Sequence, residues 1–344
     1  MAKREFLMLA QKRKDQDVIG WLESEKLDGM RCFWDGGITR GMLKADVPWA
    51  NTDKDFRYRD TQYSSGLWSR YGNVLHAPKW WTDVLPKIFL DGELYTKRED
   101  RQNLMSIVKK LIPTESWIEV FFNCFDSPPI ESIFAMGEIN TTNFKKNMKD
   151  CLNFVNKHKN ELVATIDPGT QFSVVYSVLK YFCIGGRAIA LKQEPIESLE
   201  LLNQKLLDIS CEGGEGLVIR NPSSVWVPQR SKNLLKMKKY DDDEGIVVGY
   251  ITGRETALGS KLLGMLGALV LDYKGQRLEL SGFTDQERTL NDPEWARDNP
   301  ASECPDLVEC IAFPRGSKVT FKYRGKSRDG IPQEASYWRK YDNL

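Results

Sequence analysis

The sequence predicts an α+β protein with two domains, 1–240 and 241–344. Short apolar runs separated by turns such as Asp28-Gly29 predict antiparallel strands in the first domain. Apolar residues at helical spacing within 138–162 and 193–209 predict helices that cover these sheets. About five short strands in the last part of the chain predict a small, partly open β-barrel.

Composition and charge restrict the class of protein. The 344 residues carry a formal net charge of +1, so a basic surface that binds nucleic acid must be local. The seven cysteines form no Cys-x-x-Cys pair, which argues against a structural zinc site and suits the reducing cytosol. No apolar run approaches membrane-spanning length, and we therefore expect a cytoplasmic protein.

One lysine, Lys26, lies where a predicted strand meets a turn, with Arg31 behind it. A Lys-x-Asp-Gly-x-Arg string is by default a hairpin turn with solvated charges. In the strand, however, Ser24 shares the lysine's face, whereas Glu23 and Glu25 lie on the other face. A face with few charges favours loss of the lysine's proton.

Two carboxylates, Asp91 and Glu93, interrupt the apolar run 88–95. Burying a carboxylate costs several kcal/mol, so such an acid usually has a cation, a metal or a substrate hydroxyl as partner. The alternative is an edge strand whose acids face water. Phe125-Asp126 ends another predicted strand, and Arg70 lies in a polar turn where it could also be a solvated residue.

Later in the chain, Glu215 lies between glycines in a turn that opens a strand. Lys236 and Lys238 then alternate along a predicted strand with Leu235 and Met237. Both lysines therefore point to one common space, which suits phosphate, while the apolar residues face a core. A solvated basic strand is the less favoured alternative.

The acidic run 241–244 is predicted to be a solvated linker at the domain boundary. Short strands follow at 246–251, 266–273, 277–283 and 317–323, a pattern that fits an oligonucleotide-binding (OB) barrel. Basic residues outnumber acidic ones in the tail, which indicates a surface that could follow a phosphate backbone.

Taken in order, these motifs resemble those of the ATP-dependent DNA ligases, a branch of the covalent nucleotidyltransferase superfamily. The matching strings are Lys26-Leu27-Asp28-Gly29-Met30-Arg31, Ser69-Arg70-Tyr71-Gly72, Leu90-Asp91-Gly92-Glu93, Phe125-Asp126, Glu215-Gly216-Leu217-Val218-Ile219-Arg220 and Leu235-Lys236-Met237-Lys238. Only 25 residues precede the lysine, so the plan looks most like the small bacteriophage enzymes, which would act in the host cytoplasm.

The resemblance implies a nucleotidyltransferase (adenylation) domain followed by an OB-fold domain, with Lys26 as the catalytic residue that takes the adenylate. It implies ATP as the nucleotide, Mg²⁺ or Mn²⁺ as the metal, and nicked double-stranded DNA as the partner of a monomer. The implied nucleotide-binding residues are Lys26, Arg31, Arg70, Glu93, Phe125, Lys236 and Lys238, and the implied metal-binding residues are Glu93 and Glu215.

Two departures and two alternatives accompany the resemblance. The family usually has an acidic residue where this chain has Ser24, and its last basic motif has no clear counterpart beyond 322–329 and Arg339-Lys340. The nearest alternative function is that of an RNA ligase or an RNA-capping guanylyltransferase. A non-catalytic nucleic-acid-binding relative is the other alternative, although it would not need the lysine and the carboxylates together.

Overall fold

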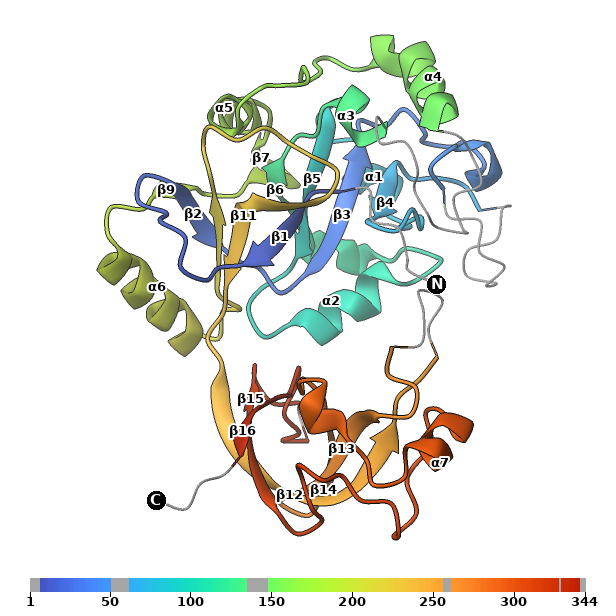
Figure 1. Cartoon of the computed structure of the whole chain (residues 1–344). Coiled ribbons are helices and arrows are strands. Elements are labelled where there is room, and N and C mark those ends of the chain that lie inside the picture. Colours follow the sequence, from blue (N-terminus) through green and yellow to red (C-terminus); the bar gives the residue numbers. More distant parts are fainter. Residues whose placement is uncertain (1–6, 51–61, 135–147, 256–260, 328, 341–344) are drawn as a thin grey trace. The chain divides into compact units, whose positions relative to one another are not determined.

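The computed structural model describes residues 7–50, 62–134, 148–255, 261–327 and 329–340 (Figure 1). The chain divides into two compact units, of which the first ends at Lys238 and the second begins at Lys239. Each unit has its own hydrophobic core. The described helices include none that is long and apolar enough to cross a membrane.

Two mainly antiparallel sheets build the first unit, and each contains one parallel pair. The six-stranded sheet has the order β4 (Leu67–Ser69), β3 (Met30–Asp35), β5 (Phe89–Tyr95), β6 (Phe121–Asp126), β8 (Ala188–Ala190) and β7 (Ile184–Gly185). The five-stranded sheet has the order β1 (Leu9–Lys12), β11 (Arg230–Met237), β10 (Leu217–Arg220), β2 (Leu22–Glu25) and β9 (Glu194–Pro195).

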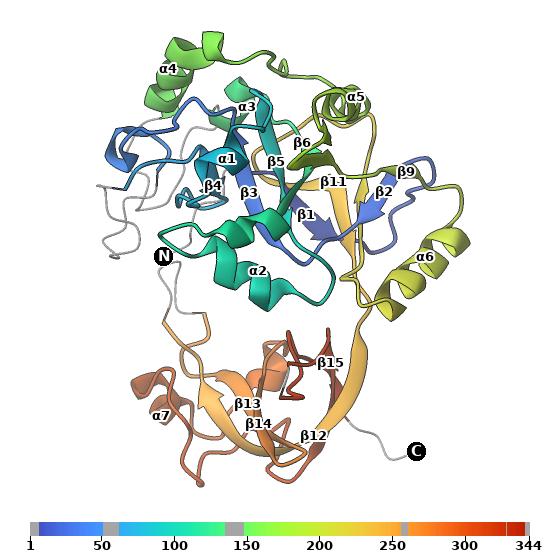
Figure 2. The same cartoon turned by 180° about the vertical axis from the view of Figure 1, so that it is seen from behind.

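The helices of the first unit lie around these sheets, as the two opposite views show (Figures 1 and 2). They are α1 (Lys79–Thr82), α2 (Arg101–Val108), α3 (Ile130–Phe134), α4 (Met148–His158), α5 (Phe172–Phe182) and α6 (Leu199–Cys211), with short 3-10 helices at Lys44–Asp46, Glu115–Glu119 and Lys159–Glu161. The helix predicted within 138–162 is therefore α4, and residues 138–147 lie outside the described part. The helix predicted within 193–209 begins later because Glu194–Pro195 forms β9.

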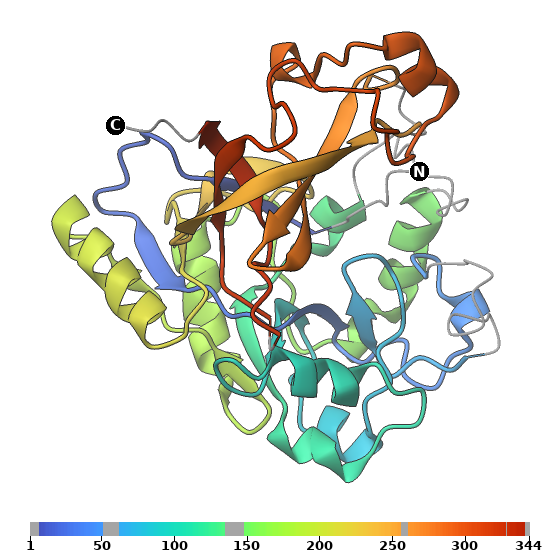
Figure 3. The same ribbon diagram turned by 90° about the horizontal axis from the view of Figure 1, so that it is seen from below.

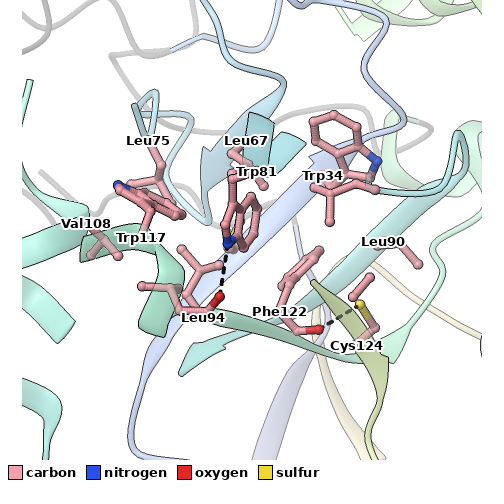
Figure 4. Close-up of a cluster of buried hydrophobic side chains, with 14 of the residues drawn as sticks. Trp34, Leu67, Leu75, Trp81, Leu90, Leu94, Val108, Trp117, Phe122 and Cys124 are labelled. Atoms are coloured by element: carbon pink, nitrogen blue, oxygen red, sulfur yellow. Dashed lines mark hydrogen bonds between the residues drawn. The ribbon is translucent and has the colours of Figure 1, made fainter. Parts of the chain in front are cut away.

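Large aromatic side chains fill the core on one face of the six-stranded sheet (Figure 4). Trp81 and Trp117 pack edge to face with ring centroids 4.9 Å apart, and the Trp81 indole donates a hydrogen bond to the Val120 carbonyl at 2.9 Å. Leu104 of α2 and Leu179 of α5 complete this core. Successive side chains of a strand point to opposite faces, and the other face carries a second core, which includes Phe33, Trp68 and Phe89, beside the polar residues that build the site.

The five-stranded sheet packs one face against α6. Leu217, Ile219 and Leu235 pack against Leu202 and Ile209 of α6. The alternate residues of β10 and β11 therefore point away from α6. As predicted, Leu235 and Met237 face this core, whereas Lys236 points to the other side, which also carries Leu234.

The second unit contains a five-stranded antiparallel sheet in the order β14 (Gln276–Leu280), β13 (Leu266–Tyr273), β12 (Asp241–Thr252), β15 (Lys318–Tyr323) and β16 (Ser336–Lys340). Figure 3 shows the curved β12 crossing this unit, which also holds α7 (Pro293–Asp298) and a 3-10 helix at Gln286–Arg288. The strands expected after residue 245 are present.

The prediction that residues 241–244 form a solvated linker is wrong. These residues begin β12 and pair with β15, with Asp242 opposite Lys322. Glu244 forms an ion pair with Lys318, and Asp243 accepts a hydrogen bond from the Tyr273 hydroxyl at 2.7 Å. The partners on neighbouring strands explain why an acidic run can form a strand here, because opposite charges across strands stabilise the pairing.

Candidate active site

Lys26 follows β2 directly, and its backbone N–H donates to the Gly216 carbonyl at 2.8 Å. Its Nζ lies 2.7 Å from Oε1 of Glu215, and Nζ of Lys238 lies 2.9 Å from the same oxygen. The Glu215 side chain is only 3% exposed, whereas that of Lys26 is 25% exposed. One buried carboxylate therefore holds two ammonium groups, and the lysine predicted to react is the more accessible of the two.

Gly216 explains how the chain brings Glu215 to this place. Its φ of +142° is in a region that side-chain-bearing residues rarely adopt. A Cβ at this position would lie 2.2 Å from the Met237 carbonyl oxygen, which is closer than any real contact. Only glycine allows β10 to start this close to the end of β11, where Lys238 follows.

Arg31 and Asp91 form a bidentate ion pair on the open face of the six-stranded sheet. Arg31 donates from Nε to Oδ1 at 2.9 Å and from Nη2 to Oδ2 at 2.6 Å. The guanidinium carbon also lies 5.3 Å from the centre of the Phe125 ring. Asp91 is fully buried, and burial raises the pKa of its carboxyl although Arg31 opposes the rise. Arg31 is thus fixed beside the aromatic ring.

Glu93 is paired with Arg31 across β3 and β5 and shares its face. Burial raises the pKa of Glu93 to about 8 against the opposing effect of Lys26 and Arg31, while Glu215 and Asp91 add to the rise. Three carboxylates therefore lie within electrostatic reach of one another. A cation placed beside Glu93 would relieve their repulsion.

A cavity of about 610 Å³ lies between the two open sheet faces of the first unit. Most of the predicted site residues line it, namely Lys26, Arg31, Arg70, Glu93, Phe125 and Lys236. Glu215 does not line it but is ion-paired with Lys26, which does, and Lys238 is ion-paired with Glu215 in turn. Strands far apart in the sequence thus bring together the lysines, the carboxylates and the aromatic ring.

Arg70 lines the same cavity together with Tyr71. Its Nη2 donates to the Tyr71 hydroxyl at 2.5 Å, and its guanidinium carbon lies 4.7 Å from the Tyr71 ring centre. The turn therefore presents Arg70 to the cavity wall. Its role toward a nucleotide or a DNA phosphate stays a prediction.

Arg220, to which the sequence assigned no role, is a second arginine in the cavity wall. It is 3% exposed, its Nη2 lies 3.5 Å from Oδ2 of Asp126, and its guanidinium carbon lies 4.8 Å from the Phe172 ring centre. Burial raises the pKa of Asp126 to about 6, although Arg220 opposes the rise. This pair connects β10 to β6 and so joins the two sheets.

A second such connection, also not predicted from the sequence, joins Arg98 to Glu25. Arg98 donates from Nε and Nη2 to the two Glu25 oxygens at 2.9 Å each, and its Nη1 binds Glu212. The sequence did contain a signal for a buried ion pair, namely a charged residue at the end of an apolar run, such as Arg220 after Leu217-Val218-Ile219. Nothing in the sequence named the partners.

The similarity of this chain to known proteins extends over both units. A family model described as the DNA ligase OB-like domain matches residues 259–340. A DNA ligase of Haemophilus influenzae (strain Rd) is 25% identical over 335 residues, which cover 97% of this chain and 91% of that protein.

Two solved structures are similar as well. A structure from a structure–function study of Lig E DNA ligases has a TM-score of 0.64 and 25% identity, with 97% of this chain and 98% of that chain covered. A structure named Pmar-Lig_Pre has a TM-score of 0.55 and 20% identity, with 96% and 66% covered, and supports the fold alone. The predicted α+β fold with an OB domain and the predicted resemblance to DNA ligases are confirmed.

Proposed function

We infer that this chain is a DNA ligase of the ATP-dependent class, and we propose that it carries the adenylate on Lys26. The observation that supports this choice is the position of the Lys26 ammonium group in the cavity, held 2.7 Å from a buried carboxylate that a second lysine shares. A covalent phosphoryl acceptor needs both a nucleophile and fixed cations nearby.

The first step joins Lys26 to the α-phosphorus of ATP. Nζ must first lose a proton, and the Glu215 carboxylate is the group placed to hold it. A P–N bond then forms as the bond to the pyrophosphate leaving group breaks. Lys236 lines the cavity and Lys238 borders Glu215, so both can offset the charge that builds on the phosphates.

The base and sugar would occupy the part of the cavity between the two sheets. Phe125 offers its ring face to adenine, and Val218 on β10 offers an apolar surface. Arg31 lies against the Phe125 ring and is fixed there by Asp91, which places its guanidinium for the ribose or the α-phosphate.

Glu93 and Glu215 could supply some, but not all, of the ligands of a magnesium ion. Glu93 is a half-buried carboxylate in the cavity wall whose pKa is raised first by loss of solvation, so a cation beside it would be stabilising. Glu215 already accepts two ammonium groups on Oε1, so its part would be to orient the ion rather than to bind it alone. Among the described residues, no group of three or more Cys, His, Asp or Glu could hold a metal, so ATP phosphates and water would supply the other ligands. When bound, the ion would neutralise phosphate charge.

Two further transfers would complete the reaction. The 5′-phosphate of a nick attacks the adenylate, the P–N bond breaks, and Lys26 regains its amine. The 3′-hydroxyl then attacks the 5′-phosphorus, releases AMP and leaves a phosphodiester. The partner is nicked duplex DNA bound by a monomer, with the OB domain as a second DNA-binding surface.

Incubation with ATP labelled at the α-phosphate tests the proposal. The protein is expected to become labelled when Mg²⁺ is present, and Lys26→Ala is expected to abolish the label. Labelled protein should then seal nicked DNA in preference to nicked RNA, because the RNA alternative is not favoured by the similarity to DNA ligases. Labelling by GTP alone, or undiminished labelling of Lys26→Ala, would contradict the proposal.

A further inference from the structure

We propose that Gln193 and Ser24 select adenine in the cavity, with the Gln193 carboxamide contacting the edge of the base. Both residues line the cavity, and neither was assigned a part in the reaction above. The inference rests on the proposed function, because it names the residues that determine which nucleotide reacts with Lys26.

Strand register places the two residues side by side. Ser24 on β2 pairs with Val218 on β10, so both side chains point to the open face of the five-stranded sheet. On the other edge of β2, Leu22 pairs with Pro195 and Glu23 pairs with Glu194. One more step of this antiparallel register brings Gln193 opposite Ser24.

The same row continues in the other direction to the phosphate-binding end. Val218 pairs with Lys236 on its other side. Lys236, Val218, Ser24 and Gln193 thus form one line across the cavity floor, with a cation at one end and a carboxamide at the other. Neighbouring strands lie about 4.8 Å apart, so Gln193 begins about 10 Å from Val218 and its side chain can reach back to the edge of a base that rests there.

The carboxylates next to Ser24 are already engaged elsewhere. Both oxygens of Glu25 accept hydrogen bonds from Arg98. Glu23 points to the opposite face, where Lys205 of α6 binds it. Selection of the base at this place therefore falls to neutral groups.

Gln193 and Ser24 have hydrogen-bonding capacity to spare. The backbone N–H of Gln193 donates to the Tyr176 hydroxyl at 3.0 Å, which fixes the main chain. Within the described residues, neither the Gln193 carboxamide nor the Ser24 hydroxyl has a hydrogen-bond partner. Gln193 is half-buried and Ser24 is 4% exposed, so a base edge in the cavity would satisfy groups that water reaches poorly.

The carboxamide suits adenine better than guanine. Its oxygen can accept from the adenine 6-amino group while its NH₂ donates to N7. Guanine presents two acceptors, O6 and N7, on the same edge, so one of the two contacts becomes repulsive. The Ser24 hydroxyl can donate or accept and adds a further contact.

The test compares ATP with purine riboside triphosphate, which lacks the 6-amino group, as donors for labelling Lys26. The wild-type chain is expected to need about tenfold more of the analogue than of ATP for half-maximal labelling. Gln193→Leu is expected to need about tenfold more ATP and to lose most of the preference for ATP. Gln204→Leu, which removes an exposed carboxamide on α6, should match the wild type.

Gln193→Met covers the case in which Gln193→Leu fails to fold, because methionine keeps an unbranched side chain of similar length but lacks the carboxamide oxygen that accepts from the 6-amino group. It is expected to lose the preference as well. A full preference for ATP in a folded, labelled Gln193 variant would overturn the inference and leave the proposed function standing. No labelling of the wild-type chain by either nucleotide would instead overturn the proposed function.

Discussion

The buried ion pair between Asp91 and Arg31 predicts a large loss of stability from a small change. Asp91→Asn replaces one of the two oxygens that accept from Arg31 with an NH₂ group, so an arginine side chain that is only 17% exposed loses its bidentate partner. Breaking a buried pair costs about 3–5 kcal/mol. Because Arg31 keeps some contact with water, we expect the free energy of unfolding to fall by about 3 kcal/mol, at the lower end of that range.

Asp83→Asn is the matched control, because Asp83 pairs with Arg40 and Lys79 but is 40% exposed. Its effect should be small, since water screens exposed pairs. Urea unfolding followed by tryptophan fluorescence reports mainly on the first unit, which holds eight of the ten tryptophans. The urea midpoint should fall by roughly 1 M for Asp91→Asn. Equal midpoints for the two variants would refute the buried-pair reasoning.

Three further predictions follow from the same unit. Burial raises the pKa of Asp35 from 3.8 to about 6, so between these values the folded state holds a proton that the unfolded state has lost. The free energy of unfolding should therefore fall by about 3 kcal/mol as pH rises through that interval. Urea unfolding at both ends of the interval should show a smaller fall in Asp35→Asn, and an unchanged fall would contradict this reasoning. Gly216→Ala forces a Cβ against the Met237 carbonyl and should abolish labelling by ATP and lower the urea midpoint, so a fully active variant would count against the close approach. Glu215→Gln leaves Lys238 buried without its counter-ion and should slow labelling at least tenfold, measured as the rate of adenylate incorporation; an unchanged rate would exclude Glu215 as the group that holds the Lys26 proton.

Much of the fold and site could be predicted because the signals are local. The glycine-rich turn before β10 and the alternation of lysines with apolar residues along β11 each lie within ten residues. Period-two alternation also identified the cavity face of β11 correctly. Such strings indicate local geometry, so Lys26, Glu215 and Lys238 could be singled out from the sequence, while their roles were implied by the resemblance to DNA ligases.

The partners of these residues could not be predicted because they depend on long-range pairing. Arg31 and Asp91 are 60 residues apart, and Arg98 and Glu25 are 73 apart. The sequence does not show which of these four residues pair with each other, because their partners are set only by the folded structure. The prediction of a linker at the acidic run 241–244 was wrong for the same reason. Its charge suggests a linker, and only the fold places the lysines and the tyrosine of neighbouring strands beside it.

Identification of the residue that carries the adenylate tests the central claim most directly. The protein would be incubated with ATP and Mg²⁺, digested, and its peptides analysed by mass spectrometry. We expect one adenylate per chain, attached to the side chain of Lys26, and none in Lys26→Ala. An adenylate on any other residue, or an undiminished adenylate in Lys26→Ala, would contradict it.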